Sequence, residues 1–192
     1  MTVRVGLLGL QGAFRDHMRP LAALGAPWQV VRGPDDLPAV DRLIIPGGES
    51  TVMAKFLTAF DLLSPLRKRI RGGMPVWGIC AGAILLAETV DGRAGLIAAL
   101  PMAVARNAYG RQLASTERSI AIPALKARSF PAVFIRAPRI LSVAPDITVL
   151  ARRDNDPVFV QRRNVMATTF HPELTDRLAV HRHFLTIQPA DR

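Results

Sequence analysis

Short apolar segments that end in glycine-containing turns constrain the fold of this chain more than any other feature. The segments Val3–Leu8, Trp28–Val31, Arg42–Ile45 and Pro75–Ile79 alternate with stretches of helical apolar spacing. Apolar runs of this kind are typical of strands buried on both faces, and their alternation with helices indicates a parallel sheet. The sequence therefore predicts one α/β domain over residues 1–192, with a mixed, mostly parallel sheet and helices on both faces.

The remaining elements are predicted from spacing and from turn residues. Helical segments are expected up to about Leu24, from about Thr51 to Arg71 before Gly72-Gly73, over Ala81–Glu88, and from about Asp176 to Leu185. The second half is richer in β structure, with strands expected at Ser119–Ile122, Ala132–Ile135, Ile147–Ala151, Val158–Gln161 and Val165–Thr169. We expect several of these strands to extend the sheet in the antiparallel sense.

Charge and composition exclude some classes of protein. The formal net charge is +10, carried almost entirely by arginines that are scattered apart from clusters such as Arg67–Arg71. A single tyrosine and the lack of any nucleic-acid-binding motif argue against a base-stacking groove. We expect a solvated basic surface rather than a nucleic-acid site, with an acidic partner as the alternative.

Cysteine usage and hydropathy bear on the compartment. One cysteine allows no internal disulfide and no thiolate metal cluster. Every apolar run is interrupted well before the length of a membrane span, and the N-terminal segment lacks the features of a secretory leader. We therefore expect a cytoplasmic protein without membrane segments.

The lone cysteine follows the fourth strand, in Gly78-Ile79-Cys80-Ala81-Gly82. Glycines two residues before and after a nucleophile, between a strand and a helix, give the spacing of a nucleophile elbow. The nucleophile is strained in such a turn, and side chains at Gly78 or Gly82 are expected to collide with the adjacent strand or helix. The start of the next helix favours a thiolate. Cys80 is the candidate nucleophile; the alternative is an inert buried thiol.

A candidate base and carboxylate occur together in Phe170-His171-Pro172-Glu173. Pro172 biases His171 away from helix, and in an extended chain residues two apart point to the same side. We therefore expect Glu173 to orient the His171 imidazole, as in a catalytic triad. Taken alone, the motif has a simpler alternative, a solvated histidine at a strand end.

A third motif, PGGEST at residues 46–51, follows the third strand. Its glycines let backbone N–H groups approach a ligand closely, and the start of a helix favours negative charge. No Gly-Lys-Ser/Thr follows, so this is not a P-loop. We expect a binding loop at the carboxyl edge of the sheet. The alternative is an ordinary turn in which Ser50 or Thr51 caps the helix.

Together the three motifs resemble those of the class I, triad-type glutamine amidotransferases. Five longer segments are similar to the glutaminase subunits of two-subunit pyridoxal 5′-phosphate synthases: VGLLGLQGAFRDH (5–17), LIIPGGEST (43–51), RNAYGRQ (106–112), VFIRAP (133–138) and TTFHPELT (168–175). The GLQGA and FIRAP segments distinguish this subfamily, whereas the triad motifs mark only the class. The resemblance implies a flavodoxin-like, three-layer α/β sandwich.

The resemblance also implies a site and a partner. Cys80, His171 and Glu173 would form the triad that releases ammonia from L-glutamine, with the N–H groups of Gly48 and Ala81 as the oxyanion hole. The residues implied to hold glutamine are Gly48, Glu49, Ser50, Arg106, Ile135 and Arg136. No cofactor or metal is implied. The implied partner is a separate synthase subunit, in a large hetero-oligomer, that uses the ammonia for vitamin B6 biosynthesis.

Two other functions stay open at this point. A glutaminase subunit of another amidotransferase, such as that of histidine biosynthesis, would share the triad but not GLQGA and FIRAP. A non-enzymatic α/β protein with a redox-sensing cysteine would not need the FHPE motif. Ile79, Ala105 and Arg139 depart from the residues usual in the family, which carries Thr, an acidic residue and His there.

Overall fold

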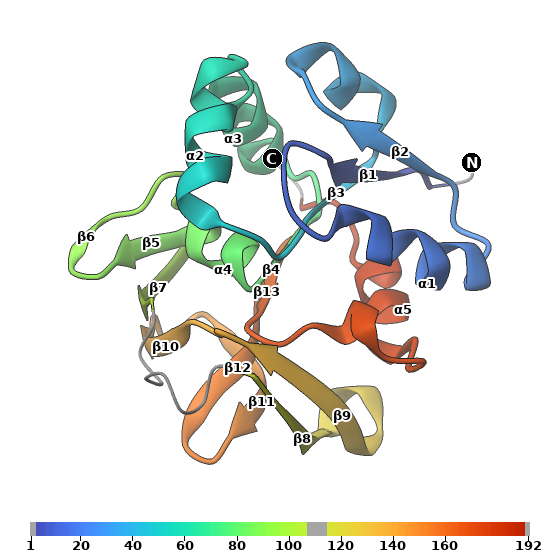
Figure 1. Cartoon of the computed structure of the whole chain (residues 1–192), viewed down its shortest axis with the longest axis vertical. Coiled ribbons are helices and arrows are strands. Elements are labelled where there is room, and N and C mark those ends of the chain that lie inside the picture. Colours follow the sequence, from blue (N-terminus) through green and yellow to red (C-terminus); the bar gives the residue numbers. More distant parts are fainter. Residues whose placement is uncertain (1–2, 107–114, 191–192) are drawn as a thin grey trace.

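The computed structural model describes residues 3–106 and 115–190, and within them a seven-stranded sheet forms the middle layer (Figure 1). Its spatial order is β11 (Thr148–Arg153), β12 (Asp156–Arg162), β13 (Val165–Thr168), β4 (Val76–Ile79), β3 (Arg42–Ile45), β1 (Val5–Leu8) and β2 (Trp28–Val31). The pairs from β13 to β2 are parallel, while β11 and β12 are antiparallel additions. The predicted mixed, mostly parallel sheet is confirmed.

Side chains of the central strands are buried on both faces of this sheet. In β3, Leu43 and Ile45 join the core on one face and Ile44 joins the core on the other. The first face is covered by α2 (Ser50–Ala59), α3 (Leu63–Arg71) and α4 (Ala81–Leu86). The second is covered by α1 (Met18–Ala23), α5 (Ala179–Thr186) and the hairpin of β8 (Ser115–Ile122) and β9 (Ala127–Ile135). The three-layer arrangement matches the expectation.

Short 3₁₀ helices complete the described part of the chain. They are η1 (Phe14–His17), η2 (Pro34–Ala39), η4 (Pro123–Leu125) and η5 (Pro172–Leu174). In the described residues no helix is both long and apolar enough to span a membrane.

The prediction of a single helix from Thr51 to Arg71 is wrong, because the helix is interrupted between α2 and α3. Asp61 has a positive φ of 53°, which a continuous right-handed helix does not allow. Pro65 lies in the first turn of α3, where its missing N–H leaves no hydrogen bond unmade. A proline at that position was the sequence signal for the break.

A second, smaller sheet was not predicted from the sequence. It contains, in spatial order, β10 (Arg139–Val143), β7 (Leu100–Ala105), β5 (Ala87–Val90) and β6 (Arg93–Ala94). The helix expected over Ala81–Glu88 ends at Leu86 instead, because Ala87 begins β5 and pairs with Leu100. This sheet places Arg106, the residue after β7, at the edge of the candidate site.

Candidate active site

Cys80 occupies a strained turn between β4 and α4, as the elbow spacing predicts. Its φ and ψ are 50° and −99°, and its N–H donates to the Thr168 carbonyl at 2.8 Å. A Cβ on Gly78 would lie 2.6 Å from the Gly82 carbonyl oxygen, and a Cβ on Gly82 would lie 2.2 Å from the Ile45 carbonyl oxygen. The expected steric need for both glycines is confirmed. A strained backbone conformation such as that of Cys80 costs about 1–3 kcal/mol, and such conformations are concentrated at functional sites.

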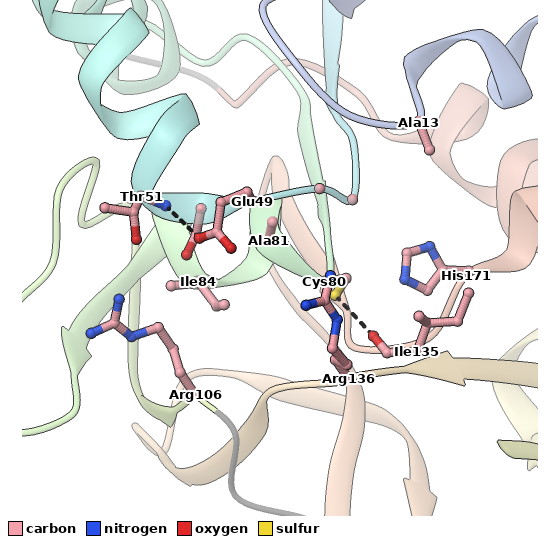
Figure 2. A pocket seen from close by; sticks show the side chains of 13 residues that line it. Ala13, Glu49, Thr51, Cys80, Ala81, Ile84, Arg106, Ile135, Arg136 and His171 are labelled. Atoms are coloured by element: carbon pink, nitrogen blue, oxygen red, sulfur yellow. Dashed lines mark hydrogen bonds between the residues drawn. The ribbon is translucent and has the colours of Figure 1, made fainter. Parts of the chain in front are cut away.

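The Cys80 thiol faces the end of β9. Its Sγ donates to the Ile135 carbonyl oxygen at 3.8 Å, a long contact of the kind that sulfur makes (Figure 2). The backbone of Ile135 therefore lies beside the candidate nucleophile.

His171 and Glu173 form the expected pair, but by a different backbone path. Nδ1 of His171 lies 2.7 Å from Oε1 of Glu173, whose side chain is fully buried. The predicted extended chain is wrong, because Glu173 lies in η5 and His171 is its N-cap. The 3₁₀ turn folds the carboxylate back onto the imidazole, where an extended chain would only have aligned the two.

The surroundings of His171 favour the protonated form of its imidazole. Burial lowers its pKa, but interactions with Cys80 and Glu173 outweigh burial and raise the pKa to about 10. Nδ1 is engaged by Glu173, and Nε2 has no hydrogen-bond partner among the described residues. Nε2 is therefore the nitrogen available to exchange a proton with the Cys80 thiol.

The loop after β3 is tied to the loop after β1. The Gly47 carbonyl accepts a hydrogen bond from the Ala13 N–H at 3.0 Å, and the Gln11 side chain accepts one from the Glu49 N–H at 2.8 Å. A Cβ on Gly12 would lie 2.0 Å from the Gly47 oxygen, so the two loops are in close contact. Gln11 was given no role from the sequence. The signal for it was the placement of both loops at the carboxyl edge of adjacent parallel strands.

One cavity of about 400 Å³ brings the predicted residues together. Its lining consists of Ala13, Gly47, Gly48, Glu49, Ser50, Thr51, Cys80, Ala81, Ile84, Arg106, Ile135, Arg136 and His171. Every residue predicted to hold glutamine is in this set, together with Cys80, His171 and Ala81. Glu173 is outside the lining, buried behind His171. Ala13, Gly47, Thr51 and Ile84 line the cavity in addition to the residues predicted to hold glutamine.

Two arginines approach the cavity from the smaller sheet and from β9. Figure 2 shows the guanidinium of Arg136 pointing toward Cys80, whereas that of Arg106 lies farther from Cys80, on the other side of Ile84. Nε of Arg106 lies 2.6 Å from Oδ2 of Asp91. Hydrogen bonds from Arg106 hold the pKa of the Asp91 carboxyl below its usual value. Residues 107–112 of the RNAYGRQ motif lie outside the described residues.

Glu49 has a structural role that the sequence analysis did not assign to it. It is the N-cap of α2, and its Oε1 accepts from the Thr51 N–H at 3.2 Å (Figure 2). The alternative from the sequence, an ordinary turn in which Ser50 or Thr51 caps this helix, is therefore not what the structure has. Ser50 is the first helical residue and is buried at the cavity wall.

Two of the departures from the family pattern are neighbours in space. Ala105 and Arg139 are partners across the β7–β10 ladder, and the Arg139 guanidinium pairs with the Asp156 carboxylate at 2.9 Å. The departures at Ala105 and Arg139 therefore lie next to each other in the structure and not at separate sites. Ile79 is fully buried in β4.

The fold and the site define a class of protein. A three-layer α/β sandwich with a cysteine elbow and a histidine–carboxylate pair at the carboxyl edge of its sheet is the arrangement of the triad-type glutamine amidotransferases. The family model of the SNO glutamine amidotransferase family matches residues 7–188. The chain belongs to this family.

Curated relatives and solved structures agree with this assignment. The chain is 50% identical to the pyridoxal 5′-phosphate synthase subunit PdxT of Roseiflexus castenholzii, over 94% of this chain and 98% of the relative. It is 46% identical to the protein of the same name from Carboxydothermus hydrogenoformans, over 95% and 96%. A crystal structure of a glutamine amidotransferase superposes with a TM-score of 0.90 at 40% identity, covering 95% of this chain and 97% of that one. PurLQS from Thermotoga maritima, with a TM-score of 0.71 at 18% identity over 96% and 98%, shares the fold.

Proposed function

We propose that this chain hydrolyses L-glutamine to L-glutamate and ammonia, and that a separate synthase subunit uses the ammonia to make pyridoxal 5′-phosphate. All 192 residues would form the one glutaminase domain. The observation that carries the proposal is the convergence of Cys80, His171 and the predicted glutamine-binding residues on one cavity. The names of the relatives support the choice of pathway. The large hetero-oligomer and the cytoplasmic location expected from the sequence stay predictions.

The proposed chemistry is acyl transfer through a thioester. The Cys80 thiolate attacks the side-chain carboxamide carbon of glutamine, and protonated His171 gives its proton to the departing ammonia. The Cys80 glutamyl thioester is then attacked by water, which His171 deprotonates, and glutamate leaves. Glu173 keeps the His171 proton on Nδ1 throughout, so that Nε2 faces the reaction.

The oxyanion of the tetrahedral intermediate needs donors that point at it. The N–H of Ala81 is at the first position of α4, where it has no intrahelical acceptor. The N–H of Gly48 belongs to the peptide whose carbonyl is held by Ala13, so it points away from Ala13. We assign these two groups to the oxyanion hole, where one such donor contributes roughly 2.7–4 kcal/mol in comparable enzymes.

The α-carboxylate and α-amino groups of glutamine have complementary partners in the cavity wall. The guanidinium groups of Arg106 and Arg136 suit the carboxylate, because a guanidinium binds a carboxylate through two parallel hydrogen bonds. The carboxylate of Glu49 suits the ammonium. Gly48, Ser50 and Ile135 would fix the side chain of the substrate between these charges and Cys80.

The direct test is ammonia release from L-glutamine by the chain alone and after titration with its cognate synthase subunit. We expect low activity alone and a rise that saturates with the synthase, because an ungated glutaminase wastes glutamine. Absence of glutamine hydrolysis in both states would refute the proposed function. Full activity without the synthase would refute only the gating.

The peptide between Gly47 and Gly48 is the element we propose as the gate. Glycines reorient a peptide without the steric penalty of other residues. In this structure the Gly47 carbonyl is bonded to Ala13, so any reorientation of the peptide breaks a contact with the GLQGA loop. A partner that binds this loop can therefore bias the equilibrium between orientations, provided it binds the competent one more tightly.

The roles assigned to His171 and Glu173 predict which of two substitutions lowers kcat more. Glu173→Gln keeps an oxygen that can accept from His171 Nδ1, whereas His171→Ala removes the group that moves the proton. In a comparable triad the carboxylate variant loses about 10⁴-fold and the histidine variant about 10⁶-fold in kcat. We expect the same order when both variants are assayed with saturating synthase. A Glu173→Gln enzyme slower than His171→Ala would contradict these assignments.

The alternative of another amidotransferase is less favoured by the relatives. Proteins named as pyridoxal 5′-phosphate synthase subunits match at 46–50% identity. A structural neighbour named for GMP synthesis is only 18% identical and shows the fold alone. Capture of a synthase subunit from a different pathway by the purified chain would favour the alternative.

A further inference from the structure

Two buried histidines lie next to the His171–Glu173 pair, outside the lining of the cavity. His17, at the end of η1, and His181, in α5, are both 0% exposed. Nδ1 of His17 lies 3.0 Å from Nε2 of His181, within hydrogen-bond distance. The Trp77 indole packs edge-on against both rings, at centroid distances of 5.5 and 4.9 Å. The proposed reaction assigns no role to either histidine.

The second nitrogen of His17 faces the second oxygen of Glu173. Nε2 of His17 is 3.9 Å from Oε2 of Glu173, while Oε1 of the same carboxylate is bonded to His171. Both facing atoms are buried, and within the described residues neither has a hydrogen-bond partner. A buried carboxylate oxygen without a donor is unfavourable. A shift of about 1 Å would bring the two atoms within hydrogen-bond distance.

The histidine pair has two possible proton arrangements, and Glu173 selects one of them. If His181 donates from Nε2 to Nδ1 of His17, the His17 proton is on Nε2 and points at the carboxylate. In the reverse arrangement a lone pair of His17 faces a lone pair of Glu173, and His181 buries an N–H at Nδ1, which has no partner in the described part of the chain. Buried donors without acceptors are rarer and costlier than unused acceptors. The first arrangement is therefore favoured on both counts.

Burial favours the neutral form of both rings. Burial lowers the pKa of His181 to about 3. Burial and the neighbouring His181 and His171 rings hold the pKa of His17 well below its usual value. With one proton on each ring, the arrangement above uses both protons in contacts that end at Glu173.

We propose that His17 is a positioning residue of the site: its Nε2–H holds Oε2 of Glu173, and His181 fixes the His17 tautomer that makes this possible. The carboxylate is then held at both oxygens, by His171 and by His17. It cannot rotate away from His171 without breaking the second contact. His17 does not touch the cavity, so its loss acts on proton transfer and not on glutamine binding.

The kinetic test uses the full chain with saturating cognate synthase, and this part rests on the proposed glutaminase function. His17→Leu is expected to lower kcat about 10- to 100-fold, by analogy with residues that orient metal ligands through a hydrogen bond, with little change in KM. His17→Gln keeps an N–H near the Nε2 position and is expected to recover most of kcat. The matched control is His183→Leu, because His183 lies in α5 with His181 but bonds to Gln161 instead.

A spectroscopic test does not depend on activity. In ¹⁵N-histidine-labelled wild-type chain, two-bond ¹H–¹⁵N correlations report the tautomer of each ring, and His17→Gln assigns the His17 signals. We expect the neutral Nε2–H tautomer for both His17 and His181. An Nδ1–H or charged His17, or an unchanged kcat in His17→Leu beside an active wild type, would overturn the proposal. An inactive wild type would overturn the function and leave the tautomer result to decide this inference.

Discussion

Replacement of Cys80 by alanine is expected to abolish glutamine hydrolysis while leaving the fold and the binding to synthase intact. The thiolate is the only group we assign to attack the substrate, so the loss in kcat should be on the order of 10⁴-fold or more. The fold should persist because the change removes one buried atom and the backbone keeps its contact with Thr168. The measurement is ammonia release with saturating synthase, beside circular dichroism and thermal unfolding of the same preparation.

Cys80→Ser is a second test of the assignment of Cys80 as the nucleophile. Serine matches cysteine in size but has a far higher pKa, so it should be nearly as inactive as alanine and should still bind glutamine. Hydrolysis at the wild-type rate in either variant would show that Cys80 is not the nucleophile.

Gly47→Ala is expected to lower kcat strongly while leaving the chain folded. A Cβ on Gly47 would lie 2.4 Å from Cε1 of His171, far inside van der Waals contact. The imidazole must move, and a displacement of about 1 Å at a catalytic group costs on the order of 10²-fold in rate. The φ of Gly47 is not positive, so the expected effect is steric and not a backbone conformational one.

Gly33→Ala is the matched control for that variant. Gly33 precedes η2 with extended backbone angles, and no atom lies within 4 Å of its added Cβ. We expect Gly33→Ala to keep wild-type kcat and stability, whereas Gly47→Ala keeps stability and loses kcat. Equal kcat in the two variants would mean that the imidazole tolerates displacement, contrary to the proposed geometry.

The sequence brought the candidate residues to one place in the fold because its motifs follow parallel strands. The elbow follows β4, the PGGEST loop follows β3 and the FHPE motif follows β13. These strands are neighbours in the sheet, so their carboxyl ends meet at one edge. Side-chain roles were carried by the resemblance, and the structure places the implied glutamine-binding residues around one cavity.

Other features had no local signal in the sequence. The smaller sheet is built from short strands that are defined by their pairing, so no hydrophobic pattern marks β5 or β6. The 3₁₀ turn at Glu173 forms within three residues, below the length at which periodicity is informative. His17 and His181 are 164 positions apart and meet only through packing of η1 against α5. Tertiary contacts of this kind cannot be predicted from spacing alone.

The adjacency of β4 and β13 has a consequence for how the protein loses activity on heating. Cys80 and His171 follow two central strands, whose ladder pairs Ile79 with Thr168. Amides in the middle of a sheet open only with the whole molecule, whereas peripheral hairpins open at lower free energy. Arg106 follows β7 and Ile135 ends β9, and both strands lie outside the seven-stranded sheet. We therefore expect partial unfolding to remove Arg106 and Ile135 from the cavity wall before the ends of β4 and β13 separate.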